Sequence, residues 1–153
     1  MIPKEFFVTS GKAVSSVSQL NAFDRALENA GIAQCNLVQV SSILPPRCKE
    51  GKLREIPVGS IIHTVMARMD GTEGMTVSAG IAWAWETHSK YGLVAEAHGQ
   101  LDQESLKVTL EWKIREMAKT REIELSEISN RTDILTVPLE NYGCVIAALI
   151  YLL

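Results

Sequence analysis

Residues 36–46 have the sequence NLVQVSSILPP, and this stretch decides how the chain on either side of it is organised. The apolar residues of 36–41 alternate closely enough to predict a β-strand. Pro45 and Pro46 then end regular structure, because proline lacks the N–H that a central strand donates to its sheet. We therefore expect the Ser41–Ser42 pair to lie where a strand runs into a turn.

Two helices are predicted on either side of this stretch. In residues 20–30 the apolar positions recur at helical spacing, with Ser18 available as the N-cap and Gly31 directly after the end. Residues 103–121 carry the strongest helical pattern, with one apolar and one charged face. Each helix is expected to bury one face.

The remaining regular segments are predicted to be strands. They cover residues 57–69, 76–85, 92–98, 122–129, 134–137 and 144–153, with a turn at 70–74 and an exposed connection at 48–55. Two helices with about six or seven strands predict a single α+β domain over residues 1–153, built as a layered sandwich. Because two helices cannot cover both faces of one such sheet, we expect either two stacked sheets or burial against other subunits.

Composition excludes several classes of partner. The 153 residues are 46% hydrophobic and 22% charged with a net charge of -3, and no basic stripe suggests binding to nucleic acid or lipid headgroups. The longest apolar run, 144–153, is about half the length of a membrane-spanning helix, and residues 1–10 lack the features of a secretory signal. Three cysteines without paired spacing and three scattered histidines predict a cytoplasmic protein with no metal site and no membrane segment.

Several segments spread along the chain form a recognisable pattern. They are LNAFD (20–24), NAGI (29–32), NLVQVSSILPP (36–46), IPVG (56–59), GLVAE (92–96), REMA (115–118) and YGC (142–144). In order and spacing these segments resemble the pyruvoyl-dependent arginine decarboxylase family, and the serine pair is the most specific part of the match. On this resemblance we expect the αββα-type layered sandwich of pyruvoyl-dependent decarboxylases.

The resemblance implies a prosthetic group made from the chain itself. In such an enzyme the Ser42 hydroxyl attacks the carbonyl carbon of Ser41 in a strained turn and converts the amide to an ester. Elimination and hydrolysis then leave a pyruvoyl group on residue 42, so that the protein consists of residues 1–41 (the β chain) and 42–153 (the α chain). The pyruvoyl ketone forms a Schiff base with the substrate amine and accepts the electrons released when carbon dioxide leaves.

The resemblance also implies roles for three further residues. Asn36 is placed near Ser42, where its amide could donate to the developing oxyanion. Glu96 is the acid that reprotonates the substrate carbon, and we expect it to be at least partly buried because burial raises the pKa of a carboxylic acid. Asp24 is placed to hold the far end of the substrate, and its carboxylate suits the guanidinium group of arginine.

Together these roles predict an enzyme that converts L-arginine to agmatine and carbon dioxide, a step that would feed polyamine synthesis or acid resistance. By the same resemblance, the cleaved protomers assemble as a homotrimer or as a hexamer made of two trimers. The active sites then lie between subunits, which fits the few elements that one protomer offers to enclose a polar substrate.

Each residue also has a simpler interpretation. The serine pair can be a plain turn, Asp24 a solvated helix residue, Asn36 an ordinary turn residue and Glu96 part of a half-exposed strand face. Residues 33–35, AQC, depart from the family's pattern and leave the substrate open. The alternatives are a pyruvoyl-dependent decarboxylase of histidine, lysine or aspartate, and a non-catalytic paralogue that binds a ligand or supports an active partner subunit.

Overall fold

Two helices and nine strands form from the residues that the computed structural model describes, which are 1–88 and 90–153. The helices are α1 (Gln19–Asn29) and α2 (Gln103–Thr120). The strands are β1 (Glu5–Ser15), β2 (Asn36–Gln39), β3 (Ile43–Leu44), β4 (Lys49–Glu50), β5 (Ile61–Thr72), β6 (Thr76–Trp85), β7 (Gly92–Gly99), β8 (Ser129–Thr136) and β9 (Tyr142–Leu152). The expected single α+β domain is confirmed.

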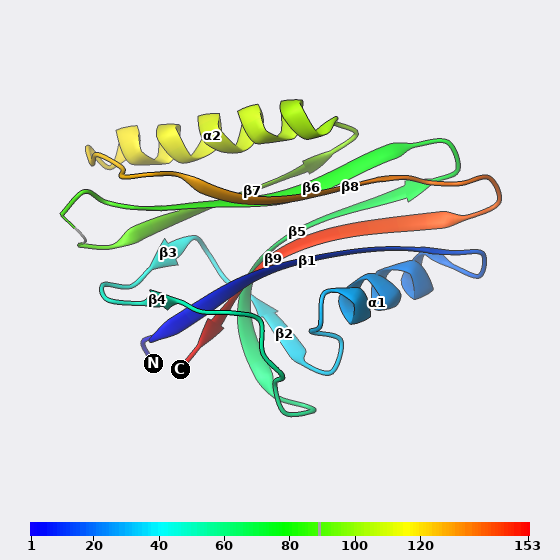
Figure 1. Ribbon diagram of the computed structural model, residues 1–153, viewed down its shortest axis with the longest axis horizontal. Helices are drawn as coiled ribbons and strands as arrows, with labels where there is room; N and C mark the ends of the chain where they lie inside the picture. Colours follow the sequence, from blue (N-terminus) through cyan, green and yellow to red (C-terminus); the bar gives the residue numbers. More distant parts are fainter. Residues whose placement is uncertain (89) are drawn as a thin grey trace.

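The strands form two sheets, which Figure 1 shows between the two helices. The five-stranded sheet has the order β2-β5-β9-β1-β4, and the four-stranded sheet has the order β3-β7-β6-β8. Strand β9 lies in the middle of the first sheet, antiparallel to both β1 and β5. This position explains why its residues 143–151 are all buried and why the sequence there is almost wholly apolar.

Helix α1 covers the outer face of the five-stranded sheet, where it packs on β1 and β9. Its buried residues, Ala22 and Ala26, are small and allow a close approach to the sheet. Gly11 in β1 is needed for this approach, because a methyl group there would collide with the carbonyl oxygen of Ala26. The Ser18 side chain caps the helix by accepting a hydrogen bond of 3.0 Å from the Asn21 N–H.

Helix α2 covers the outer face of the four-stranded sheet. It packs on β7 and β6 through Leu106, Leu110 and Ile114. The inner faces of the two sheets meet in an apolar core to which β5, β6 and β9 contribute, for example through Val65 and Ile81. Stacking of the two sheets therefore covers the faces that the two helices leave free.

The predicted secondary structure was wrong in several parts. Strand β1 was missed, because Thr9, Ser10 and Gly11 interrupt its apolar pattern, although it pairs with β9 along its whole length. Residues 122–129 were expected to be a strand, but Ile123 donates to the Ala118 carbonyl oxygen and closes the end of α2 instead. The turn expected at 70–74 is shorter, since β5 continues to Thr72.

No helix among the described residues is both long enough and apolar enough to span a membrane.

Candidate active site

The Ser41–Ser42 peptide links the edges of the two sheets. On one side the Val40 N–H donates to the Thr64 carbonyl oxygen of the five-stranded sheet at 2.9 Å. On the other side the Ser42 carbonyl oxygen accepts from the Val94 N–H of the four-stranded sheet, also at 2.9 Å. The expected position of the pair, where a strand runs into a turn, is confirmed: β2 ends at Gln39 and Ser42 lies in a bend.

The backbone at this link does not show the strain that we expected. Neither Ser41 nor Ser42 has a positive φ, and the nearest non-glycine residue that does is Arg47, at 66°. The link is short because it crosses directly from the edge of one sheet to the edge of the other. Any reactivity of the peptide therefore depends on where the Ser42 hydroxyl is held.

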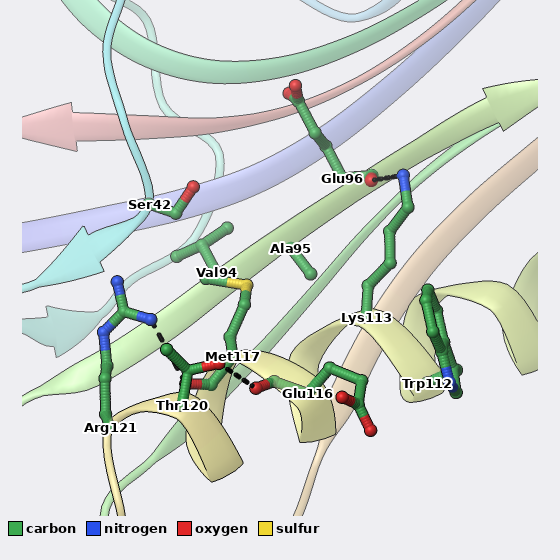
Figure 2. A pocket seen from close by; sticks show the side chains of 10 residues that line it. All are labelled: Ser42, Val94, Ala95, Glu96, Trp112, Lys113, Glu116, Met117, Thr120 and Arg121. Atoms are coloured by element: carbon green, nitrogen blue, oxygen red, sulfur yellow. Dashed lines mark hydrogen bonds between the residues drawn. The ribbon is translucent and has the colours of Figure 1, made fainter.

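Ser42 and Glu96 line the same open pocket, which we call the Ser42–Glu96 pocket. Its volume is about 390 Å³, and its lining consists of Ser42, Val94, Ala95, Glu96, Trp112, Lys113, Glu116, Met117, Thr120 and Arg121. In Figure 2 the Ser42 hydroxyl and the Glu96 carboxylate point to the same side, away from α2. A single chain therefore brings together two of the three residues that sequence analysis placed at the reaction centre.

Glu96 is exposed over much of its surface in the single chain, but nearby protein atoms remove part of the water around its carboxyl group, and this partial burial agrees with the expectation. The exposure arises because β3 pairs with β7 only at Gly92 and Leu93, so that at Glu96 the strand pairs with β6 on one edge and its other edge is open. Nearby protein atoms nevertheless raise the pKa of the Glu96 carboxyl by removing part of its water, while His98 and Lys113 lower it. The direction of the net shift is the one that a general acid needs.

Lys113 reaches from α2 to the main chain of Glu96. Its ammonium group donates to the Glu96 carbonyl oxygen at 2.9 Å, as Figure 2 shows. This bond ties the helix to the strand that carries the acid. Sequence analysis treated Lys113 only as part of the charged face of a helix, and no pattern in the sequence points to its partner.

Asn36 lies away from Ser42 in the same chain. It begins β2, and its side-chain amide donates to the Gly59 carbonyl oxygen at 3.0 Å. The chain from Asn36 to Val40 follows β5 in an extended conformation, so Asn36 lies about 13 Å from Val40, and Ser42 comes two residues later. Asn36 and Ser42 therefore do not meet within one protomer.

Asp24 is also far from the Ser42–Glu96 pocket. It is an exposed residue of α1, on the outer face of the five-stranded sheet, and lines a separate pocket of about 380 Å³ with Val17, Ser18, Leu20 and Asn21. The Ser42–Glu96 pocket lies at the edge of the other sheet, against α2. One chain thus holds two of the expected site residues together and keeps the other two apart.

Tyr151 is a polar residue at the serine pair that sequence analysis missed. Its hydroxyl donates to the Ile43 carbonyl oxygen at 2.8 Å, although the side chain is 6% exposed and packs in the core between the sheets. A signal was present in the sequence, because a hydroxyl within a buried apolar strand needs a hydrogen-bond partner. The identity of that partner follows only from the fold.

Among the described residues, no group of three or more His, Cys, Asp and Glu side chains is placed to hold a metal ion.

Comparison with known proteins identifies the family of this chain. A family model described as pyruvoyl-dependent arginine decarboxylase matches residues 5–153. The chain is 34% identical over 150 residues to the protein of that name from Methanopyrus kandleri, which covers 98% of this chain and 97% of the relative. It is 35% identical over 152 residues to the protein of that name from Methanococcus aeolicus, and the match covers 95% of this chain and 88% of the relative. It is 36% identical over 147 residues to the protein of that name from Methanothermobacter thermautotrophicus, and the match covers 95% of this chain and 94% of the relative. On this evidence the chain belongs to the pyruvoyl-dependent arginine decarboxylase family.

Proposed function

We propose that this chain decarboxylates L-arginine to agmatine and carbon dioxide by means of a covalently bound pyruvoyl group formed from Ser42. The observation that carries the proposal is that Ser42 and Glu96 line one pocket. Support comes from the raised pKa of the Glu96 carboxyl, which lines the same pocket as Ser42, the proposed source of the ketone. The names of the three relatives support arginine as the substrate, since each is called an arginine decarboxylase.

Residue 42 suits a pyruvoyl group. Its side chain is half-buried and lines a pocket whose volume falls in the range of small-molecule sites. The bound group supplies an acceptor for the electrons released with carbon dioxide. We propose that it arises by self-cleavage between Ser41 and Ser42, which divides the chain into residues 1–41 and 42–153.

Glu96 is proposed as the acid that protonates the substrate carbon. Its carboxylate and the Ser42 hydroxyl point to the same side of the pocket, as Figure 2 shows. Partial removal of water raises the pKa of Glu96, so a larger fraction stays protonated at a given pH than for a fully hydrated glutamate.

Asn36 and Asp24 are proposed to act on the Ser42–Glu96 pocket of a neighbouring copy, Asn36 as an oxyanion donor and Asp24 as the partner of the substrate guanidinium. The assembly that we propose is a homotrimer or a pair of trimers. Exposed apolar side chains at the β2 edge support an interface there: Val38, Val40 and Ile61 are 42%, 39% and 70% exposed in the single chain.

We also propose that the fold is the αββα-type sandwich of pyruvoyl-dependent decarboxylases. The order of α1, the five-stranded sheet, the four-stranded sheet and α2 supports this classification. A cytoplasmic location is supported by the free thiols of Cys35, Cys48 and Cys144, which suit a reducing compartment. There the production of agmatine would serve polyamine synthesis or acid resistance.

Intact-mass analysis of the purified protein tests the proposal. We expect two fragments, and the larger should be lighter by one ammonia than a fragment that begins with an unmodified Ser42. A panel of arginine, lysine, histidine and aspartate should then give the highest rate of carbon dioxide release with arginine. A cleaved protein that prefers another amino acid would favour the first alternative, and a single uncut chain without activity would favour the non-catalytic paralogue.

A further inference from the structure

The segment after the proposed cleavage site is held at two successive carbonyl groups. The Ser42 carbonyl oxygen accepts from the Val94 N–H at 2.9 Å, and the Ile43 carbonyl oxygen accepts from the Tyr151 hydroxyl at 2.8 Å. The first bond is a main-chain contact between β7 and the residue before β3. The second is made by a side chain and can therefore be removed by one substitution.

Tyr151 is well placed to act as a fixed anchor. It lies near the end of β9, the middle strand of the five-stranded sheet, and only 6% of the residue is exposed. Burial raises the pKa of the Tyr151 hydroxyl to about 12, so the group keeps the proton that it donates. The aromatic ring packs in the core between the sheets and leaves the hydroxyl little freedom to move.

The Tyr151 side chain also borders the serine pair. It lines a second cavity, of about 290 Å³, together with Ser41, Ile43 and His63. This cavity lies beside Ser41, whereas the Ser42–Glu96 pocket includes Ser42. The buried phenol therefore connects the rigid centre of one sheet to the chain that crosses to the other.

Attack of the Ser42 hydroxyl on the Ser41 carbonyl carbon requires that the two atoms be held close to contact, and small displacements slow such reactions strongly. The φ values of the two serines show no strain that could drive the reaction instead. We propose that Tyr151 is a positioning residue, whose bond to the Ile43 carbonyl oxygen orients the Ser41–Ser42 peptide for self-cleavage and afterwards fixes residue 42 beside Glu96. This inference rests on the proposed self-cleavage.

The test compares Tyr151→Phe with Thr9→Val. Tyr151→Phe keeps the buried ring and removes only the hydroxyl. Thr9 is the matched control, because its hydroxyl is also buried and also donates to a carbonyl oxygen at 2.8 Å, that of Ala30 beneath α1. Cleavage is followed on denaturing gels after synthesis of each chain, and thermal unfolding shows how much stability each variant has lost.

We expect Tyr151→Phe to lengthen the half-time of cleavage about five- to tenfold, the effect of one neutral hydrogen bond, while Thr9→Val cleaves at the normal rate. In the cleaved fraction of Tyr151→Phe, kcat for arginine should fall several-fold. KM should stay unchanged, because Tyr151 contacts the main chain at Ile43 and lines the second cavity.

Three results would overturn the inference. If wild type and Tyr151→Phe cleave at the same rate, Tyr151 does not position the peptide, and the proposed function is unaffected. If Thr9→Val slows cleavage as much as Tyr151→Phe, the effect reflects stability alone. If the wild-type chain stays uncut with an unmodified Ser42, the proposed function fails and the role of Tyr151 fails with it.

Discussion

The Ser42–Glu96 pocket and the surroundings of Asp24 and Asn36 are built in different ways. Ser42 and Glu96 come together at the edge of the four-stranded sheet of one chain. Asp24 lies on α1 and Asn36 at the far end of β2, both on the five-stranded sheet. The comparison teaches that one protomer brings together the hydroxyl proposed to start cleavage and the acid proposed to deliver a proton. Asp24 and Asn36, proposed as the substrate partner and the oxyanion donor, would act on this pocket only from a second copy.

Substitution of Ser42 should have the largest effect. Ser42→Ala removes the hydroxyl that attacks the Ser41 carbonyl carbon, so we expect one uncut chain and no detectable release of carbon dioxide from arginine. A denaturing gel measures cleavage of the chain, and a carbon dioxide assay measures decarboxylation of arginine. Ser16→Ala, at an exposed position before α1, should be cut like wild type. A Ser42→Ala chain that still divides into two fragments would contradict the proposed chemistry.

Substitution of Glu96 is expected to affect turnover without affecting cleavage of the chain. Glu96→Gln keeps the size of the side chain but cannot supply the proton, so turnover should fall about a hundredfold or more while the chain is still cut. Steady-state rates per cleaved protomer measure this. Glu104→Gln, exposed in the first turn of α2, is the control and should leave turnover unchanged. Normal turnover of Glu96→Gln would remove Glu96 from its role.

Substitution of Asp24 tests the group that is proposed to bind the substrate from outside the Ser42–Glu96 pocket of its own chain. Asp24→Ala should leave cleavage intact and lower kcat/KM for arginine about tenfold or more, the expected loss for one charged hydrogen-bonded partner. Glu28→Gln, one turn later on α1, should behave like wild type.

A mixing experiment then shows whether two copies share a site. Co-expression of Asp24→Ala chains with Glu96→Gln chains should give more activity than either variant alone, because some sites would combine an intact Asp24 with an intact Glu96. Activity that stays at the level of the separate variants would count against a shared site.

The smallest expected effect is on pH dependence. Glu96 acts as an acid only when it is protonated, so turnover should fall as the pH rises through its raised pKa. His98 and Lys113 are the positive neighbours that lower this pKa. His98→Gln removes one of them, so the alkaline limb of a plot of kcat against pH should move to higher pH. A limb that stays in place or moves to lower pH would contradict this electrostatic explanation.

Elements with strong local signals could be predicted from the sequence. Both helices agree with their predicted ranges within one residue at each end, and the N-cap predicted at Ser18 is confirmed. Strand β6 has the predicted range, Thr76–Trp85, because it carries a long apolar pattern. Strand β1 could not be predicted in this way, because its stability comes from pairing with β9, more than a hundred residues away in sequence.

The candidate site shows the same division. The sequence supplied the identity of Ser42 and Glu96 through the family pattern, and the structure brings them to one pocket. Whether Asp24 and Asn36 lie near Ser42 depends on how the two sheets stack and how copies assemble, which no local pattern records. The partner of Tyr151 was hidden for the same reason, since residues 43 and 151 meet only in the folded chain.

The pairing of β1 with β9 has a further consequence for a chain cut between Ser41 and Ser42. Residues 5–15 of the smaller fragment stay bound along the full length of a strand in the larger one, and α1 packs over both. Once denatured, such fragments become separate molecules, and their recovery becomes a second-order reaction that slows on dilution. A cut as proposed would therefore have to follow folding, and the cut protein would regain its structure far less readily than the uncut chain.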